Sequence, residues 1–124
     1  MLARINNELG AISIDENIIN EVIAETIRSF KGNVRAYKNA QNRQIKMTEE
    51  GVFIHVELVL KIGTSISEVA GSLIDALRRL VEEQLELEID NIEVKISGMQ
   101  SFGKTMPRDI LYDSKNGLVR WNEQ

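Results

Sequence analysis

Residues 51–85 read GVFIHVELVLKIGTSISEVAGSLIDALRRLVEEQL, and this stretch determines the fold class of the chain. Over residues 52–62 it alternates at period two, which predicts a long strand with one face on a core and the other mostly in water. The face expected to point inward carries Val52, Ile54, Val56, Leu58, Leu60 and Ile62, and the opposite face carries Phe53, His55, Glu57, Val59 and Lys61.

A helix is predicted after this strand. Ser65 and Glu68 have the spacing of a capping box, in which each side chain bonds the backbone N–H of the other residue. From about residue 66 to residue 84, apolar residues recur at intervals of three and four, which indicates an amphipathic helix with one buried stripe. On its exposed side, Arg78 and Glu82 lie four residues apart and can pair.

The flanking segments complete a predicted two-layer domain. We expect a short strand over 11–14, a helix of about four turns from residue 16, a strand over 34–38 that resumes over 44–48, and a last strand over 89–96. The order β-α-β-β-α-β predicts an α+β sandwich with two helices on one face of a mixed four-strand sheet, plus a C-terminal extension. The crossover through the second helix should make the long strand and the last strand parallel.

The composition changes near the end of this last strand. Residues 97–104 are mostly small and polar, which is typical of a linker, so we expect a domain over residues 1–99 and a C-terminal tail over residues 100–124. Within the tail, Asn116-Gly117 lies between two apolar runs and favours a hairpin turn. Two interpretations remain open: a frayed tail, or a hairpin that docks on an exposed sheet edge of this molecule or another, with Trp121 as its anchor.

The bulk composition is that of a small globular protein without thiol chemistry. The chain has 124 residues, 43% hydrophobic and 27% charged, and no cysteine, so disulfides and thiolate sites are excluded. No apolar run approaches the ~20 residues that span a bilayer, and the N-terminus lacks the apolar core of a signal peptide. We therefore expect a soluble cytoplasmic protein that reaches a membrane only through a partner or a surface patch.

Charge is distributed unevenly along the chain. Residues 28–46 contain six basic residues and no acid, whereas residues 82–93 contain six acids and no base. These runs are either two solvated faces or surfaces that dock protein partners and further copies of the chain. The candidate interaction residues are Arg28, Lys31, Arg35, Lys38, Arg43, Lys46, Glu82, Glu83, Glu86 and Trp121.

The basic run also supports a second hypothesis, a small RNA-binding domain. Its cations could contact phosphates while Tyr37 stacks on a base. The net charge of −4 argues against this hypothesis. So does the absence of a Gly-x-x-Gly helix-loop-helix and of an aromatic-rich sheet motif.

No pattern in the chain indicates catalysis. His55 is the only histidine, and on the outward face of the long strand we expect it to be exposed rather than a metal ligand or a general base. The turn Gly63-Thr64-Ser65 lacks the glycine spacing and the Lys-Ser/Thr pair of a phosphate-binding loop. We therefore expect a non-enzymatic protein with no metal and no cofactor.

One pattern runs through most of the chain, from residue 7 to residue 99. It consists of the segments NELGAISID (7–15), VIAE (22–25), GVFIHVEL (51–58), ISEVA (66–70) and IEVKISGM (92–99). The pattern resembles the alkaline shock protein family, the bacterial envelope stress response domain found mainly in Gram-positive organisms.

This resemblance implies a cytoplasmic scaffold or adaptor without catalytic activity or cofactor. It implies self-assembly into a homo-oligomer and docking to an integral membrane anchor protein, which would place the chain at the inner face of the cell membrane. Two features depart from the family pattern and bear on which partner is bound. Residues 30–35 are basic where many members have a Gly/Ala-rich stretch, and the tail after Met99 differs from the usual short end.

Overall fold

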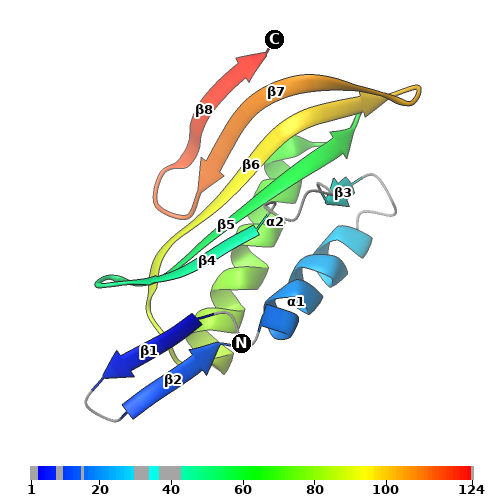
Figure 1. Cartoon of the computed structure of the whole chain (residues 1–124). Coiled ribbons are helices and arrows are strands. Elements are labelled where there is room, and N and C mark those ends of the chain that lie inside the picture. Colours follow the sequence, from blue (N-terminus) through cyan, green and yellow to red (C-terminus); the bar gives the residue numbers. More distant parts are fainter. Residues whose placement is uncertain (1–2, 8–9, 15, 30–33, 37–42, 124) are drawn as a thin grey trace.

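The computed structural model describes residues 3–7, 10–14, 16–29, 34–36 and 43–123 of the chain. These residues form a twisted main sheet with a pair of helices on one of its faces (Figure 1). A separate two-stranded sheet, made of β1 (Ala3–Asn7) and β2 (Gly10–Ile14), contacts the main sheet beside β4. The architecture is therefore α+β, as the sequence predicts.

The main sheet is built around β5 (Gly51–Lys61) and β6 (Ile89–Ser101), which run parallel as predicted. Beyond β6 lie β7 (Lys104–Asp113) and then β8 (Gly117–Glu123), each antiparallel to its neighbour. The other side of β5 carries two strands in one row. They are β4 (Arg43–Thr48), which pairs with the first half of β5, and β3 (Val34–Ala36), which pairs with its end.

The two helices form the second layer. Helix α1 (Glu16–Arg28) packs against α2 (Ile66–Arg79), and α2 packs against β6. A π-helical turn, η1 (Leu80–Gln84), continues α2 to the residue at which the sequence predicts its end. The predicted pair between Arg78 and Glu82 is present across this junction, with Nε and Oε1 3.8 Å apart.

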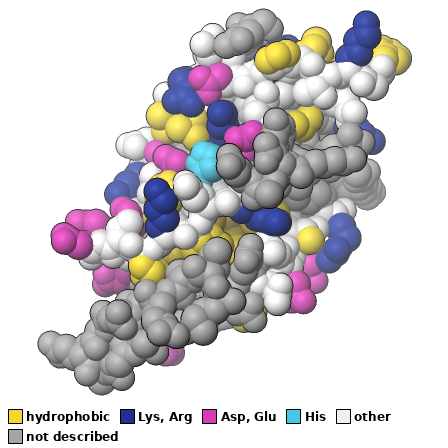
Figure 2. All heavy atoms as spheres, viewed as in Figure 1, with side chains coloured by type: hydrophobic (Ala, Val, Ile, Leu, Met, Phe, Trp, Pro, Cys, Tyr) yellow, Lys and Arg dark blue, Asp and Glu magenta, His cyan; other side chains and the backbone are white. Residues whose placement is uncertain are grey.

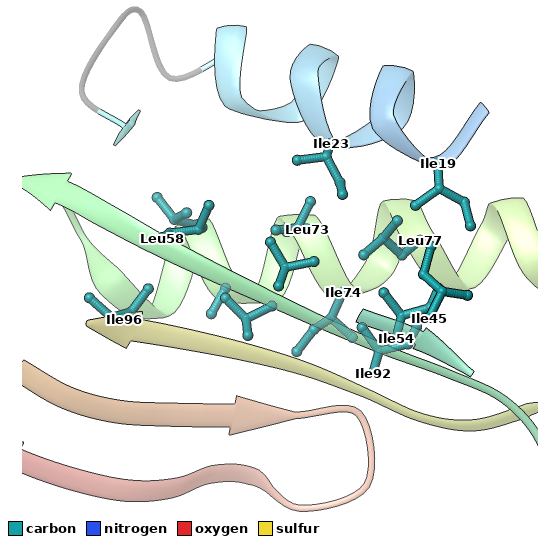
Figure 3. Close-up of a cluster of buried hydrophobic side chains, with 14 of the residues drawn as sticks. Ile19, Ile23, Ile45, Ile54, Leu58, Leu73, Ile74, Leu77, Ile92 and Ile96 are labelled. Carbon is teal, nitrogen blue, oxygen red and sulfur yellow. The ribbon is translucent and has the colours of Figure 1, made fainter. Parts of the chain in front are cut away.

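Strict alternation on β5 produces the core. Its even-numbered residues from Val52 to Leu60 are at most 1% exposed and point toward the helices. Leu73 and Leu77 of α2 and Ile19 and Ile23 of α1 close over them (Figure 3). Burying one such side chain contributes roughly 1.5–3 kcal/mol, so this interlayer cluster is the main source of stability.

The predicted sheet of four strands is wrong in extent and in membership. The main sheet has six strands, because β7 and β8 extend it on the β6 side and because the segments before β5 form two strands, β3 and β4. The predicted strand over 11–14 exists as β2, but it pairs with β1, a strand that the sequence did not indicate. A strand of five residues can satisfy its backbone on any neighbouring edge, so its pattern does not specify its sheet.

Two local predictions are also wrong. Ile62 is 52% exposed because β5 ends at Lys61. Ser65 occupies the cap position of α2, but its side chain makes no cap hydrogen bond, and its hydroxyl lies 3.5 Å from that of Ser67. The spacing of a capping box is therefore present without its bonding.

The linker predicted over residues 97–104 is instead the end of β6 and a tight turn. Glycine at position 98 allows β6 and β7 to approach closely, because a Cβ there would lie 2.6 Å from Cγ2 of Thr105 and 3.3 Å from the Met106 carbonyl oxygen. Phe102 and Gly103 follow with φ of 50° and 79°, the left-handed pair of a two-residue hairpin turn. The second hairpin is confirmed, with Asn116-Gly117 at the end of its turn, and it docks on the β6 edge of its own molecule.

Candidate interaction surfaces

The face of the main sheet opposite the helices, which we call the open face, carries a ladder of paired acidic and basic side chains (Figure 2). The two pairs between β5 and β6 join residues that the register places directly opposite one another, and the pair between β7 and β8 joins diagonal neighbours. The pairs are His55–Glu93, with Nδ1 and Oε1 3.0 Å apart, Glu57–Lys95, with Oε1 and Nζ 4.0 Å apart, and Asp109–Arg120, joined by two hydrogen bonds of 2.6 and 2.8 Å. Because cations and anions alternate, the open face has no strong single sign of charge.

His55 is not the exposed strand residue that the sequence predicts. Its side chain is 22% exposed, and it lies between strands in contact with Glu93, whose side chain is 25% exposed. Within the residues that the structure describes, no three histidine, cysteine or acidic side chains are arranged to hold a metal ion. The contact with Glu93 accounts for the position of the ring.

Asp109 and Arg120 form the tightest pair of the ladder. The hydrogen bonds from Arg120 hold the pKa of Asp109 below its ordinary value, and the same bonds raise the pKa of Arg120. A two-point contact between a guanidinium and a carboxylate fixes orientation as well as distance. This pair therefore ties β7 to β8 on the open face.

The described members of the basic run do not form one patch. Arg28 is exposed at the end of α1. Arg43 and Lys46 lie on opposite faces of β4, because Arg43 is opposite buried Val56 whereas the Lys46 ammonium lies over the Phe53 ring, 5.9 Å from its centre. Lys31 and Lys38 lie outside the described residues, as does the side chain of Arg35 on β3.

The acidic run follows the chain around the end of α2 and onto β6. Glu82 and Glu83 are exposed on η1, and Glu86 is exposed with a φ of 55°. Asp90 accepts a hydrogen bond from the Thr48 hydroxyl at 2.9 Å and pairs with the Lys115 ammonium at 3.4 Å. The run thus divides between solvated carboxylates and carboxylates that join strands.

Trp121 lies on β8 and is 47% exposed. It stands opposite Ile110, which is fully buried, so it points to the helix side of the sheet. Leu118, 50% exposed, stands opposite Tyr112, which packs against the core on the same side. Trp121 therefore belongs to an apolar strip on the outermost strand and not to either charged run.

The turn between β7 and β8 is fixed by a network that the sequence did not predict. The Ser114 hydroxyl accepts a bond from the Ile92 N–H at 3.0 Å and donates to Asn91, while Arg78 of α2 donates to the Ser114 carbonyl at 3.2 Å. Together these bonds join the turn to β6 and α2. The sequence signal was an aspartate at the start of an Asn-Gly turn, a position where Asp accepts backbone bonds.

Asp113 is the charged residue inside this network, and it is 7% exposed. Burial raises its pKa, but hydrogen bonds from the N–H groups of Asn116 and Lys115 and from the Asn116 and Asn91 side chains outweigh burial and hold the pKa below its ordinary value. The carboxylate is therefore ionised and acts as the acceptor that closes the turn.

Comparison with known proteins identifies the family. The model of the alkaline shock protein 23 family, described as having a cell envelope-related function, matches residues 4–101. The chain belongs to the alkaline shock protein family. An uncharacterized protein of Streptococcus pyogenes serotype M6 is 22% identical over 120 residues, which cover 84% of this chain and 99% of that protein. No solved structure matches the chain.

The family match has a structural boundary. It extends from β1 to the end of β6, so β7 and β8 lie outside the matched residues. The resemblance predicted from residues 7–99 is confirmed, and the family gives this alkaline shock protein a cell envelope-related function. Within its described residues, no helix is both long enough and apolar enough to span a membrane.

Proposed function

We propose that this chain is a non-enzymatic scaffold or adaptor that works at the inner face of the cell membrane. In this proposal it docks to an integral membrane anchor protein and associates with further copies of itself. The observation that carries the proposal is the family match over residues 4–101, with its cell envelope-related function.

The open face is the surface that best suits the anchor. It spans four adjacent strands, its charged side chains are partly buried, and acids and bases alternate on it. Protein interfaces commonly combine such paired charges with aromatic contact area, here supplied by Phe53 beneath Lys46. A partner would be selected by complementary charge positions and not by net charge.

The RNA-binding alternative gains no support from this geometry. Nucleic-acid binding depends on cations gathered along one face. Here Arg28, Arg43 and Lys46 are spread over a helix and both faces of a strand. On the open face, Lys95 and Arg120 are each engaged by a carboxylate.

Site-specific photo-crosslinking in the native cells tests the proposal. A photoreactive amino acid replaces Lys46 on the open face or, as the matched control, Asp75, which is exposed on α2. We expect the Lys46 position to crosslink to an integral membrane protein in the membrane fraction, with the yield unchanged by nuclease. The Asp75 position should give far less of this product.

Two results would contradict the proposal. Recovery of the chain in the cytosolic fraction, without a membrane crosslink from either position, would remove the adaptor function. Crosslinks to RNA-associated proteins that disappear with nuclease would favour the alternative.

A further inference from the structure

The outermost strand, β8, presents an unprotected sheet edge. It pairs with β7 on one side only, and no described element lies on its other side (Figure 1). Soluble proteins usually block such an edge with charged side chains, above all lysine, with proline or with a covering segment. β8 reads GLVRWNE and contains neither lysine nor proline; its charged residues are Arg120, which is bound to Asp109, and Glu123 at the end of the strand. Its backbone groups are therefore available to another strand.

The exposed side chains of β8 are apolar and favour contact with another apolar surface. Leu118, Val119 and Trp121 are 50%, 46% and 47% exposed, which makes them half of the large exposed hydrophobic residues among those described. Leu118 and Trp121 share the helix side of the sheet, whereas Arg120 lies on the open face with Asp109. Val119 is the extra residue where the register with β7 shifts.

The opposite edge of the main sheet is different. There β3 and β4 share one row, and β4 contacts the β1–β2 hairpin. The longer of the two, β4, contains Lys46, and lysine is the residue type that most often blocks a sheet edge. If β8 pairs only with β8 of a second molecule, the contact has twofold symmetry and uses the free edge of both copies. Association through this edge therefore stops at a dimer.

The sequence of β8 is complementary to itself in one antiparallel register. When Leu118 is placed opposite Trp121 of a second copy, Gly117 falls opposite Asn122 and Val119 opposite Arg120. Residues directly opposite one another lie on the same face, so this register puts both apolar pairs on the helix side. The only charged residue in the paired segment, Arg120, then faces a valine and not a second arginine.

We propose that two copies of this chain pair through β8, antiparallel and in this register, to form one continuous sheet across a twofold axis. The four side chains Leu118 and Trp121 from both copies would form an apolar cluster between the two helix layers. This pairing rests on the proposed function, since it names the contact for the association between copies, and it places that contact outside the family-matched residues 4–101.

Disulfide trapping with purified protein tests the register, because the natural chain has no cysteine. We would prepare Leu118→Cys and Trp121→Cys and incubate each alone and mixed in oxidised glutathione, which oxidises two thiols to one disulfide. Residues 118 and 121 face each other only between copies. We therefore expect a covalent dimer in the mixture and little in either variant alone. A mixture of Trp121→Cys with Ile62→Cys, which replaces an equally exposed residue, controls for random collisions.

Sedimentation gives an independent test that needs no cysteine. The natural chain should sediment at twice its 14.0 kDa mass. Val119→Lys, which places a lysine on the free edge, should shift it to the single mass with an unchanged circular dichroism spectrum. Ile62→Lys adds the same charge elsewhere and should leave the dimer intact. The proposal is overturned if the natural chain is monomeric over the whole concentration range, or if the mixed cysteine variants crosslink no faster than the control.

These outcomes are separable from those of the proposed function. The dimer is measured with purified protein, whereas the anchor is measured in membranes. A dimer without a membrane crosslink counts against the adaptor and leaves the β8 contact standing. A membrane crosslink from a protein that is monomeric in solution supports the adaptor and counts against the β8 contact.

Discussion

Leu73 of α2 lies at the centre of the interface between the helices and the sheet and is fully buried (Figure 3). Shortening it to alanine removes apolar contacts and leaves a cavity, so we expect Leu73→Ala to lower the free energy of unfolding by about 2–5 kcal/mol. Urea denaturation followed by circular dichroism measures this. Ile62→Ala truncates an exposed side chain and should change stability by less than about 0.5 kcal/mol. Equal effects of the two variants would mean that the faces are wrongly assigned.

Asp113 supplies a pH-dependent contribution to stability. Because its pKa is lower in the folded state than its ordinary value of 3.8, the ionised form stabilises the fold, and this contribution is fully present above pH 3.8. It is lost as the pH falls through the folded pKa. Asp113→Asn should therefore be less stable than the natural chain by about 1–3 kcal/mol at pH 7, with a gap that narrows below pH 3.8.

Unfolding midpoints in urea at several pH values test this expectation. Asp109 remains in both proteins, so its own lowered pKa cancels in the comparison. Asp75→Asn removes an exposed carboxylate and should change stability little at any pH. If the difference in stability between the natural chain and Asp113→Asn stays constant down to pH 2, ionisation of Asp113 does not stabilise the turn.

At the scale of elements, the β7–β8 hairpin is part of the main core. Ile110 of β7 is fully buried and belongs to the same cluster as Leu73 and Ile96. We expect Ile110→Ala to lower the stability of the whole chain by about 2–5 kcal/mol in a single cooperative transition. If residues 1–99 fold independently of the tail, the variant will instead show two transitions, with the one from the larger domain unchanged.

Sequence periodicity was sufficient to predict a strand or helix that contacts the core along many of its residues. The alternation of β5 and the stripe of α2 each contain five or more buried positions. β5 was predicted within one residue at each end, and α2 together with η1 covers the predicted range 66–84. The signal is weak in β7, where only the apolar run before the Asn-Gly turn indicated a strand. That strand contains Pro107, Arg108 and Asp109 and contributes only two buried side chains before its final aspartate. It is a strand because β6 offers it an edge, and no local pattern contains that information.

The open face could not have been predicted for a related reason. His55 and Glu93 are 38 residues apart in the sequence, and they meet because β5 and β6 are parallel in one register. A shift of one residue would turn the whole ladder toward the helices. The sequence shows the charged residues as runs of neighbours along the chain. The pairs on the open face form between neighbours on adjacent strands, and the runs do not indicate which strands are adjacent.

At the scale of the whole molecule, association through β8 should make thermal stability depend on concentration. A contact made only by the folded chain shifts the unfolding equilibrium by mass action, so the melting temperature of a dimer rises with protein concentration. We expect this rise for the natural chain and for Ile62→Lys. We expect a melting temperature independent of concentration for Val119→Lys, which keeps the fold and loses the edge contact.

Calorimetry over a hundredfold range of concentration measures this dependence. At the lowest concentrations the natural chain and Val119→Lys should converge, because both are then monomeric and differ only at one exposed residue. Persistence of a large difference at high dilution would mean that Val119→Lys acts on the fold of the monomer. A melting temperature of the natural chain that does not move with concentration would mean that β8 remains an unpaired edge in solution, and that any assembly at the membrane must use a different surface.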